Sequence, residues 1–184
     1  MIRKIFSETI FYTGEVGPTD LFKIDRQELL FNIAESYYLK KYHNNTELLK
    51  IVNIRSLTQL AHWWYDARAF DLHKRNLQSP NLVVQDTYAL HILPGDQSQK
   101  RNHNHINDDK LSPDYTFIYC VDVQKDSSQL IIDFDDHRRK NRTWTINLEN
   151  NYFYCFPSSL NYYITKNTSE RINTLLIQTY EEIR

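Results

Sequence analysis

The chain has 184 residues, of which 41% are hydrophobic and 24% charged, and its net charge is −1. This length suits one domain with a core of its own, so we treat residues 1–184 as a single domain. The near-neutral charge argues against a surface that binds nucleic acid or membrane through bulk charge, and no apolar run approaches the length of a membrane-spanning helix.

Two further features of the sequence predict the redox state of the cysteines and the cellular location of the protein. Both cysteines, Cys120 and Cys155, lie in apolar runs typical of strands, which indicates buried free thiols in a reducing compartment. The first residues contain no apolar core of signal-peptide length. We therefore expect a cytoplasmic protein.

The N-terminal part, residues 1–78, predicts short strands followed by supporting helices. Gly14 and Gly17 interrupt one or two strands within residues 1–24. Asp25 followed by Glu28 is typical of a helix start. The helix is expected to end around residues 43–45. Its apolar residues recur at helical spacing: Leu29, Leu30, Ile33, Ala34, Tyr37 and Tyr38.

Two more helices are predicted before residue 79. Thr46 can cap a short helix that runs through Ile51. The Ser56-Leu-Thr-Gln59 sequence has the pattern of a capping box and predicts a longer helix to about Lys74. Its buried face is expected to consist of Leu57, Leu60, Ala61 and Trp64.

From residue 79 onward the apolar pattern has a period of two, which predicts strands. The stretch 135–141 is polar and is expected to be a loop, while Asn150-Asn151 can form a tight turn. Short strands without intervening helices indicate a sandwich or a barrel; they are expected near residues 87–93, 115–121, 129–134, 143–148, 152–156, 160–165 and 172–180.

One motif in this half predicts a metal site. A Pro94-Gly95 turn follows the first of these strands, and His103-Asn-His105 comes shortly after it. In an extended segment, residues i and i+2 point to the same face, so the two imidazoles would converge as ligands of one metal must. A third ligand has to come from elsewhere in the chain.

Four sequence motifs follow one another along the chain. The first is the turn Leu93-Pro-Gly-Asp96 with the His103-Asn-His105 pair after it. The others are Phe117-Ile-Tyr-Cys-Val121, Asn151-Tyr-Phe-Tyr-Cys-Phe-Pro-Ser158 and Ser169-Glu-Arg-Ile172. Over roughly residues 80–180 the chain resembles the Fe(II)- and 2-oxoglutarate-dependent oxygenases, in particular the small prolyl-hydroxylase-like group of phages and marine bacteria. The resemblance implies a mainly β fold, a double-stranded β-helix or jelly roll over residues 79–184, with the N-terminal helical segment packed on one sheet.

The resemblance also implies Fe(II) and 2-oxoglutarate as cofactors, and it assigns roles to five residues. His103 and His105 map to the first two metal ligands, and Tyr162 occupies the position of the distal histidine ligand. Arg171, nine residues further on, would hold the far carboxylate of 2-oxoglutarate bidentately. Tyr119 would donate a hydrogen bond to the cosubstrate, and Tyr154 is an alternative donor.

The tyrosine at the distal position leaves several alternatives open. A phenol with an ordinary pKa near 10 is a poor ligand for Fe(II). Asn107 or Asp108 competes with His105 for the second position, and His137 competes with Tyr162 for the third. The leading prediction is an oxygenase that hydroxylates an unknown small molecule or peptide. The alternatives are a degenerate jelly-roll homologue that acts as a binding or interaction protein, and a cupin-like metal protein of other chemistry.

Overall fold

The computed structural model describes residues 11–17, 24–39, 48–51, 55–74, 81–103, 112–137 and 140–183, without the side chains of residues 55–56 and 134–141. Neither described helix combines the length and the apolar composition that crossing a membrane requires. The elements in chain order are β1 (Tyr12–Glu15), α1 (Arg26–Leu39), β2 (Leu49–Lys50), α2 (Arg55–Lys74), β3 (Asn81–Ile92), β4 (Tyr115–Asp122), β5 (Gln129–His137), β6 (Lys140–Asn147), β7 (Tyr152–Pro157), β8 (Asn161–Ile164) and β9 (Asn173–Ile183).

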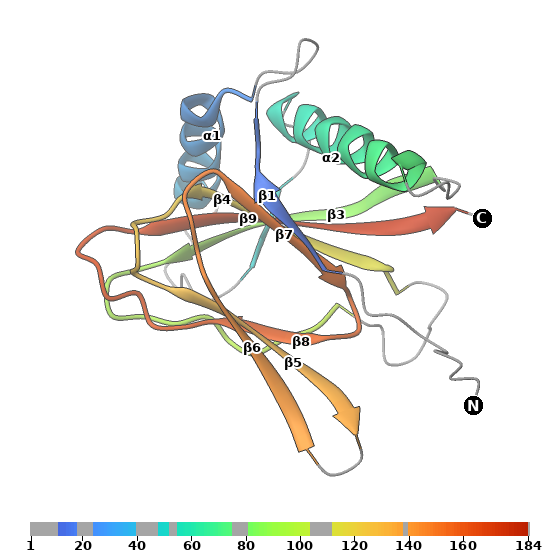
Figure 1. Cartoon of the computed structure of the whole chain (residues 1–184). Helices are drawn as coiled ribbons and strands as arrows, with labels where there is room; N and C mark the ends of the chain where they lie inside the picture. Colours follow the sequence, from blue (N-terminus) through green and yellow to red (C-terminus); the bar gives the residue numbers. More distant parts are fainter. Residues whose placement is uncertain are drawn as a thin grey trace.

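The strands form two antiparallel sheets, as the period-two pattern predicts. The larger sheet has the order β1-β7-β4-β9-β3-β2, and the smaller one has the order β6-β5-β8. The helices α1 and α2 lie on one face of the larger sheet, and the smaller sheet lies on its other side (Figure 1). The molecule is therefore mainly β. The two helices cover one face of the central sheet, and the smaller sheet covers the other.

The central sheet separates two cores, because successive side chains of a strand point to opposite faces. Along β4, Phe117 and Tyr119 belong to the core beneath the helices, which we call the helix-side core. Ile118 and Cys120 belong to the core between the two sheets, which we call the inner core. All four side chains are fully buried.

The helix α1 begins directly after Asp25, as predicted, and α2 begins at Arg55, next to the predicted start at Ser56. The carboxylate of Asp25 accepts hydrogen bonds from the amides of Gln27 and Glu28, each 3.0 Å long, and so caps the start of α1. In α2, the predicted apolar face is buried at Leu57, Leu60 and Trp64, whereas Ala61 is partly buried.

Two local predictions are wrong. Instead of a helix through Ile51, residues Leu49 and Lys50 form β2, in which Leu49 pairs with Ala89 of β3. Leu49 is 1% exposed there, so burial at the edge of the sheet overrides the local capping signal. The expected loop at 135–141 is shorter than predicted, because β5 and β6 continue their backbone pairing as far as His137 and Lys140.

The predicted turn at Asn150-Asn151 is confirmed. Asn151 has a φ of 68°, in the left-handed region that asparagine tolerates better than most residues. Its side chain also ties the turn to the N-terminal strand, because Nδ2 donates to the carbonyl of Val16 over 3.0 Å.

Candidate functional site

The segment between the Pro94-Gly95 turn and His103 lies alongside β8. Gly95 has a φ of 85°, which explains why a glycine is needed in this turn. Two backbone hydrogen bonds of 2.8 and 2.9 Å join Arg101 to Tyr162, and the amide of Ser98 donates to the carbonyl of Ile164 over 3.1 Å. The segment thereby extends the smaller sheet and brings His103 to Tyr162.

His103 and Tyr162 are in direct contact. The Nε2 atom of His103 lies 2.8 Å from the hydroxyl oxygen of Tyr162, and the two rings are stacked with centroids 5.8 Å apart. Tyr88 of β3 stacks on His103 with the same centroid distance. Sequence reasoning missed Tyr88, although it alternates with Leu90 and Ile92 along β3 and so points to the inner core.

The phenol of Tyr162 is kept neutral by its surroundings. Its side chain is 1% exposed, and burial raises the pKa of the phenol well above its ordinary value because the charged form loses its hydration. A neutral phenol can donate its proton to Nε2 of His103, which leaves the other ring nitrogen as the protonated one.

The two donor atoms have a spacing that one metal ion could use. Ligands about 2.1 Å from an ion and at right angles to each other are about 3 Å apart, close to the 2.8 Å seen between His103 and Tyr162. His103 and Tyr162 therefore fit two positions around an iron ion, provided that the phenol loses its proton.

The other predicted ligands cannot be placed. His105, Asn107 and Asp108 lie outside the described residues, and so does the side chain of His137. Across the described parts of the chain, no group of three or more His, Cys, Asp and Glu side chains could hold a metal ion. A complete metal site thus depends on residues beyond His103 and Tyr162.

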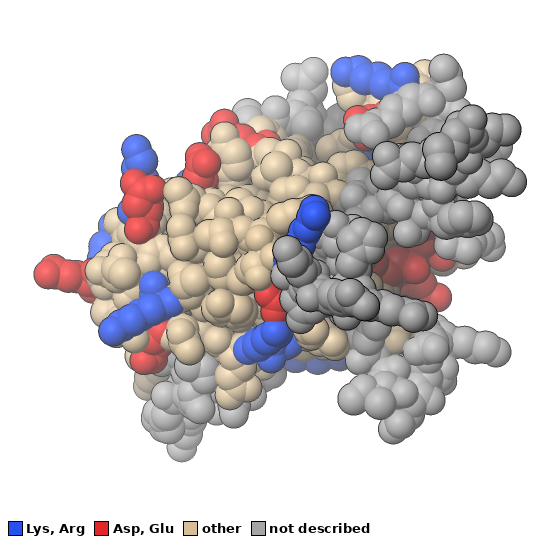
Figure 2. Space-filling view, turned by 60° about the horizontal axis from the view of Figure 1, so that its bottom comes forward, with Lys and Arg blue, Asp and Glu red and all other residues tan. Residues whose placement is uncertain are grey.

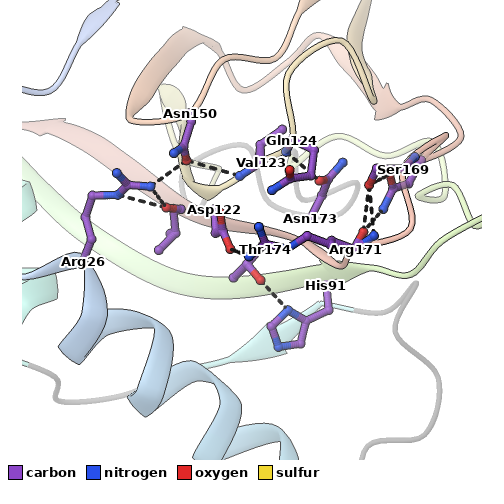
Figure 3. Close-up of polar contacts among 12 residues, drawn as sticks. Arg26, His91, Asp122, Val123, Gln124, Asn150, Ser169, Arg171, Asn173 and Thr174 are labelled. Atoms are coloured by element: carbon purple, nitrogen blue, oxygen red, sulfur yellow. Dashed lines mark hydrogen bonds and ion pairs between the residues drawn. The ribbon is translucent and has the colours of Figure 1, made fainter.

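Arg171 is not brought to this pair by any described contact. Its side chain is 67% exposed, and its guanidinium lies 3.5 Å from the carboxylate of Asp122 at the end of β4. Figure 3 shows this ion pair at the rim of the larger sheet, beside Asn173 and Thr174. Asn167 fixes the preceding turn, because its Nδ2 donates to the Arg171 carbonyl over 2.7 Å.

Tyr119 lies on the opposite side of the central sheet from Tyr162. Its ring belongs to the helix-side core, and its hydroxyl donates to Oδ1 of Asn151 over 2.9 Å. Burial raises the pKa of Tyr119 to about 12. The neighbouring Cys120 is the residue that faces the inner core. The alternation of side chains along β4 could have shown from the sequence that Tyr119 and Cys120 face opposite sides of the sheet.

The inner core next to Tyr162 is mainly apolar. Its fully buried members include Ile118, Leu175 and Ile177. Tyr154 also belongs to it, but its hydroxyl already donates to the carbonyl of Asn147 over 3.0 Å. Ile118, Leu175 and Ile177 therefore offer no polar group to a dicarboxylate, and the Tyr154 hydroxyl is already bonded.

The described surface has no dominant charge on the face that Figure 2 shows. With the β5–β6 side turned forward, Lys and Arg residues alternate with Asp and Glu residues around a broad uncharged area. One ion pair joins Lys100, in the segment after β3, to Asp133 of β5. Among the described residues on this face, the charges of both signs are mixed and form no basic stripe for a nucleic-acid backbone.

Comparison with known proteins gives a match in structure alone. No family model matches the sequence, and no curated protein matches it. A prolyl-4-hydroxylase from Pseudomonas putida is 10% identical with a TM-score of 0.61, covering 95% of this chain and 93% of its own. A viral collagen prolyl hydroxylase from Paramecium bursaria Chlorella virus-1, solved with 2-oxoglutarate, is 12% identical with a TM-score of 0.61, covering 94% and 96%.

Two further solved structures extend this result. A prolyl hydroxylase from Trichoplax adhaerens, in complex with a hypoxia-inducible-factor peptide, is 13% identical with a TM-score of 0.60 and covers 94% of this chain and 83% of its own. A Burkholderia pseudomallei oxidoreductase of the 2-oxoglutarate–Fe(II) oxygenase family is 9% identical with a TM-score of 0.51, covering 73% and 64%. At these identities the match concerns the fold. The chain has the jelly-roll fold of the Fe(II)- and 2-oxoglutarate-dependent oxygenases.

Proposed function

We propose that the chain is a non-haem iron, 2-oxoglutarate-dependent oxygenase that hydroxylates a small molecule or a peptide in the cytoplasm. The observation that carries the proposal is the convergence of His103 and Tyr162, which come from different segments and have their donor atoms 2.8 Å apart. The fold supports the same function, because solved enzymes of this chemistry share it over most of the chain.

In this proposal, His103, His105 and Tyr162 hold the metal. Iron with bound 2-oxoglutarate supplies the oxidising power for hydroxylation when it is present. Tyr162 has to release its phenol proton before it can act as a ligand. A bound cation favours this release, because it lowers the pKa of the group that it binds. The stacked Tyr88 keeps the His103 ring in the orientation that faces Tyr162.

Arg171 is the proposed anchor for the far carboxylate of 2-oxoglutarate. It first has to leave Asp122, and this costs little because an ion pair with an exposed partner contributes only about 0–1 kcal/mol. A guanidinium can then bind the carboxylate through two parallel hydrogen bonds. Tyr119 has no part in this arrangement, since its hydroxyl is bonded to Asn151 on the helix side.

The test is an anaerobic titration of the protein with Fe(II) and 2-oxoglutarate, followed by addition of oxygen. We expect a weak visible charge-transfer band and oxygen-dependent conversion of 2-oxoglutarate to succinate. His103→Ala should abolish both signals, whereas the matched control His73→Ala, on α2, should leave them unchanged. Absence of both signals in the wild-type protein rejects the proposal.

A second candidate is a metal-free homologue that binds a partner and catalyses no reaction. Three observations favour it: the pKa of Tyr162 is raised by burial, the adjoining inner core is apolar, and Arg171 is paired with Asp122. It makes a distinct prediction for Tyr162→His, which restores an imidazole. Metal binding that appears only in this variant supports the second candidate, while binding by the wild-type chain supports the first.

A further inference from the structure

A cavity of about 700 Å³ lies on the helix side of the central sheet, between α2 and the β3–β9 part of that sheet. Figure 1 shows α2 running above β3, with the smaller sheet on the other side. The cavity is thus separated from His103 and Tyr162 by the central sheet. Leu57 and Ala61 of α2 form its roof, and Gln178 and Thr87 form part of its floor.

The floor of the cavity is polar although it is buried. Gln178 is 1% exposed, and its carbonyl oxygen accepts a hydrogen bond of 2.8 Å from the hydroxyl of Tyr180. This bond directs the amide nitrogen of Gln178 the other way. The nitrogen lies 3.4 Å from both the Leu57 carbonyl and the Thr87 hydroxyl, at the limit of hydrogen bonding.

A buried amide with such long contacts costs free energy of folding, because it has given up hydration for weak hydrogen bonds. Leucine at position 178 would avoid this cost, as Leu176 does two residues earlier on the same face of β9. An acceptor atom of a ligand in the cavity would give the Gln178 amide the stronger hydrogen bond that it lacks.

The walls and the mouth restrict the kind of ligand. Leu82, Val84 and the ring of Tyr65 supply apolar surface next to Leu57 and Ala61. The oppositely charged residues of the lining, Lys50 and Asp86, form an ion pair with each other. The mouth therefore has no excess charge with which to attract an ion, and an uncharged ligand loses the least hydration on entry.

We propose that this cavity is a binding site for a small uncharged molecule that has an apolar body and a carbonyl group. The carbonyl accepts a hydrogen bond from the Gln178 amide, and the apolar body lies between α2 and the sheet. The site is independent of iron and of 2-oxoglutarate. It has the size of ordinary small-molecule sites, which combine apolar walls with a few polar groups.

The test uses Nile red, an uncharged aromatic ketone whose fluorescence increases in apolar surroundings, at pH 8, where imidazoles are ordinarily neutral. We expect saturable binding by the wild-type protein at micromolar concentrations. Ala61→Phe, which fills the cavity, should weaken binding at least tenfold. The matched control Ala69→Phe changes a partly buried residue of α2 outside the cavity lining and should leave binding within twofold.

Competition then tests the charge of the ligand. Methyl decanoate should displace Nile red at a concentration at least tenfold lower than decanoate does, because only the carboxylate carries a charge into the cavity. Equal displacement by the two compounds, no saturable Nile red binding by the wild-type chain, or unchanged binding by a folded Ala61→Phe variant would each overturn the proposal.

A measurement on the unmodified protein covers the case in which Ala61→Phe does not fold. The side-chain amide signals of Gln178 are recorded by nuclear magnetic resonance before and after addition of methyl decanoate. We expect these two signals to move with a saturable dependence on concentration, while the exposed amide of Gln97 serves as an internal control. Stationary Gln178 signals reject the site.

Discussion

The hydroxyl oxygen of Tyr162 lies 2.8 Å from Nε2 of His103, although 59 positions separate the two residues in the sequence. Together with the backbone bonds between Arg101 and Tyr162, this contact fastens the segment before His103 to β8. The bond needs no metal to form. It therefore stabilises the protein in the absence of iron, and its removal has a measurable effect.

Tyr162→Phe removes this hydrogen bond and keeps the buried ring. We expect the free energy of unfolding to fall by about 1–2 kcal/mol, because the His103 nitrogen loses its partner in partly buried surroundings. Urea denaturation without added metal measures the change. Tyr163→Phe, the neighbouring and partly buried residue of β8, is the control and should change stability by less than about 0.5 kcal/mol. Equal stability of the two variants would contradict a structural role for the Tyr162 hydroxyl.

Asp122→Asn releases Arg171 from its ion pair. If Arg171 anchors 2-oxoglutarate, the variant should bind this cosubstrate several-fold more tightly, because the guanidinium no longer has to leave a carboxylate. Calorimetric titration measures the affinity, and stability should change little because Arg171 is 67% exposed. Glu170→Gln removes a neighbouring exposed carboxylate that has no ion pair with another described residue, and it serves as the control. An unchanged affinity in Asp122→Asn would argue against Arg171 as the anchor.

Because His91 is partly buried, we expect the free energy of unfolding to fall in mild acid. Burial lowers the pKa of His91 to about 4, whereas an imidazole in the unfolded chain has a pKa of about 6.5. As the pH falls from 6.5 towards 4, the unfolded state takes up a proton that the folded state does not. Stability that is present above pH 6.5 is therefore lost progressively in this window, by up to about 3 kcal/mol.

The contribution of His91 can be isolated with the variant His91→Gln. Between pH 7 and pH 5, the wild-type free energy of unfolding should fall by about 2 kcal/mol more than that of the variant. The ring stacks on Tyr37 with centroids 4.2 Å apart, and Nδ1 lies 2.9 Å from the Thr174 hydroxyl (Figure 3 shows the latter contact). Parallel pH dependences of the two proteins would show that His91 remains free to titrate in the folded state.

Asn167→Asp tests the turn that precedes Arg171. The Nδ2 atom of Asn167 donates to the carbonyls of Ile92 and Arg171 over 2.9 and 2.7 Å, and an aspartate would face both carbonyls with a charged acceptor. Since Asn167 is 1% exposed, we expect a loss of about 3 kcal/mol in urea denaturation. Asn161→Asp keeps the acceptor that Asn102 uses on the exposed edge and should be nearly neutral. Similar losses in both variants would contradict this account.

The sequence predicted most of the fold because the apolar pattern is local information. The start of α1 follows from its capping residue Asp25, α2 begins at Arg55 beside the predicted Ser56, and the strands follow from the period of two. The short strand β2 could not be found in this way. Leu49 is extended because it pairs with Ala89, a residue 40 positions away, and no local preference records that partner.

The candidate site was predicted less completely. The register of the segment that carries His103 is set by its backbone bonds to β8, and these bring His103 next to Tyr162; their joint role as metal ligands stays a prediction. The direction of a side chain at the end of a strand depends on its partners, however, and Arg171 turns towards Asp122. Gln178 gave no signal either, because a single polar residue in an apolar strand can face either core, and only packing shows that it faces a cavity.

The position of β9 has a consequence for how the chain folds during synthesis. This strand lies at the centre of the larger sheet, where it pairs with β4 on one side and β3 on the other. The two halves of the sheet are therefore not joined until residues 173–183 have left the ribosome. Until then, β3 and β4 each lack a partner on one edge, and unpaired strand edges of this kind favour association with other chains.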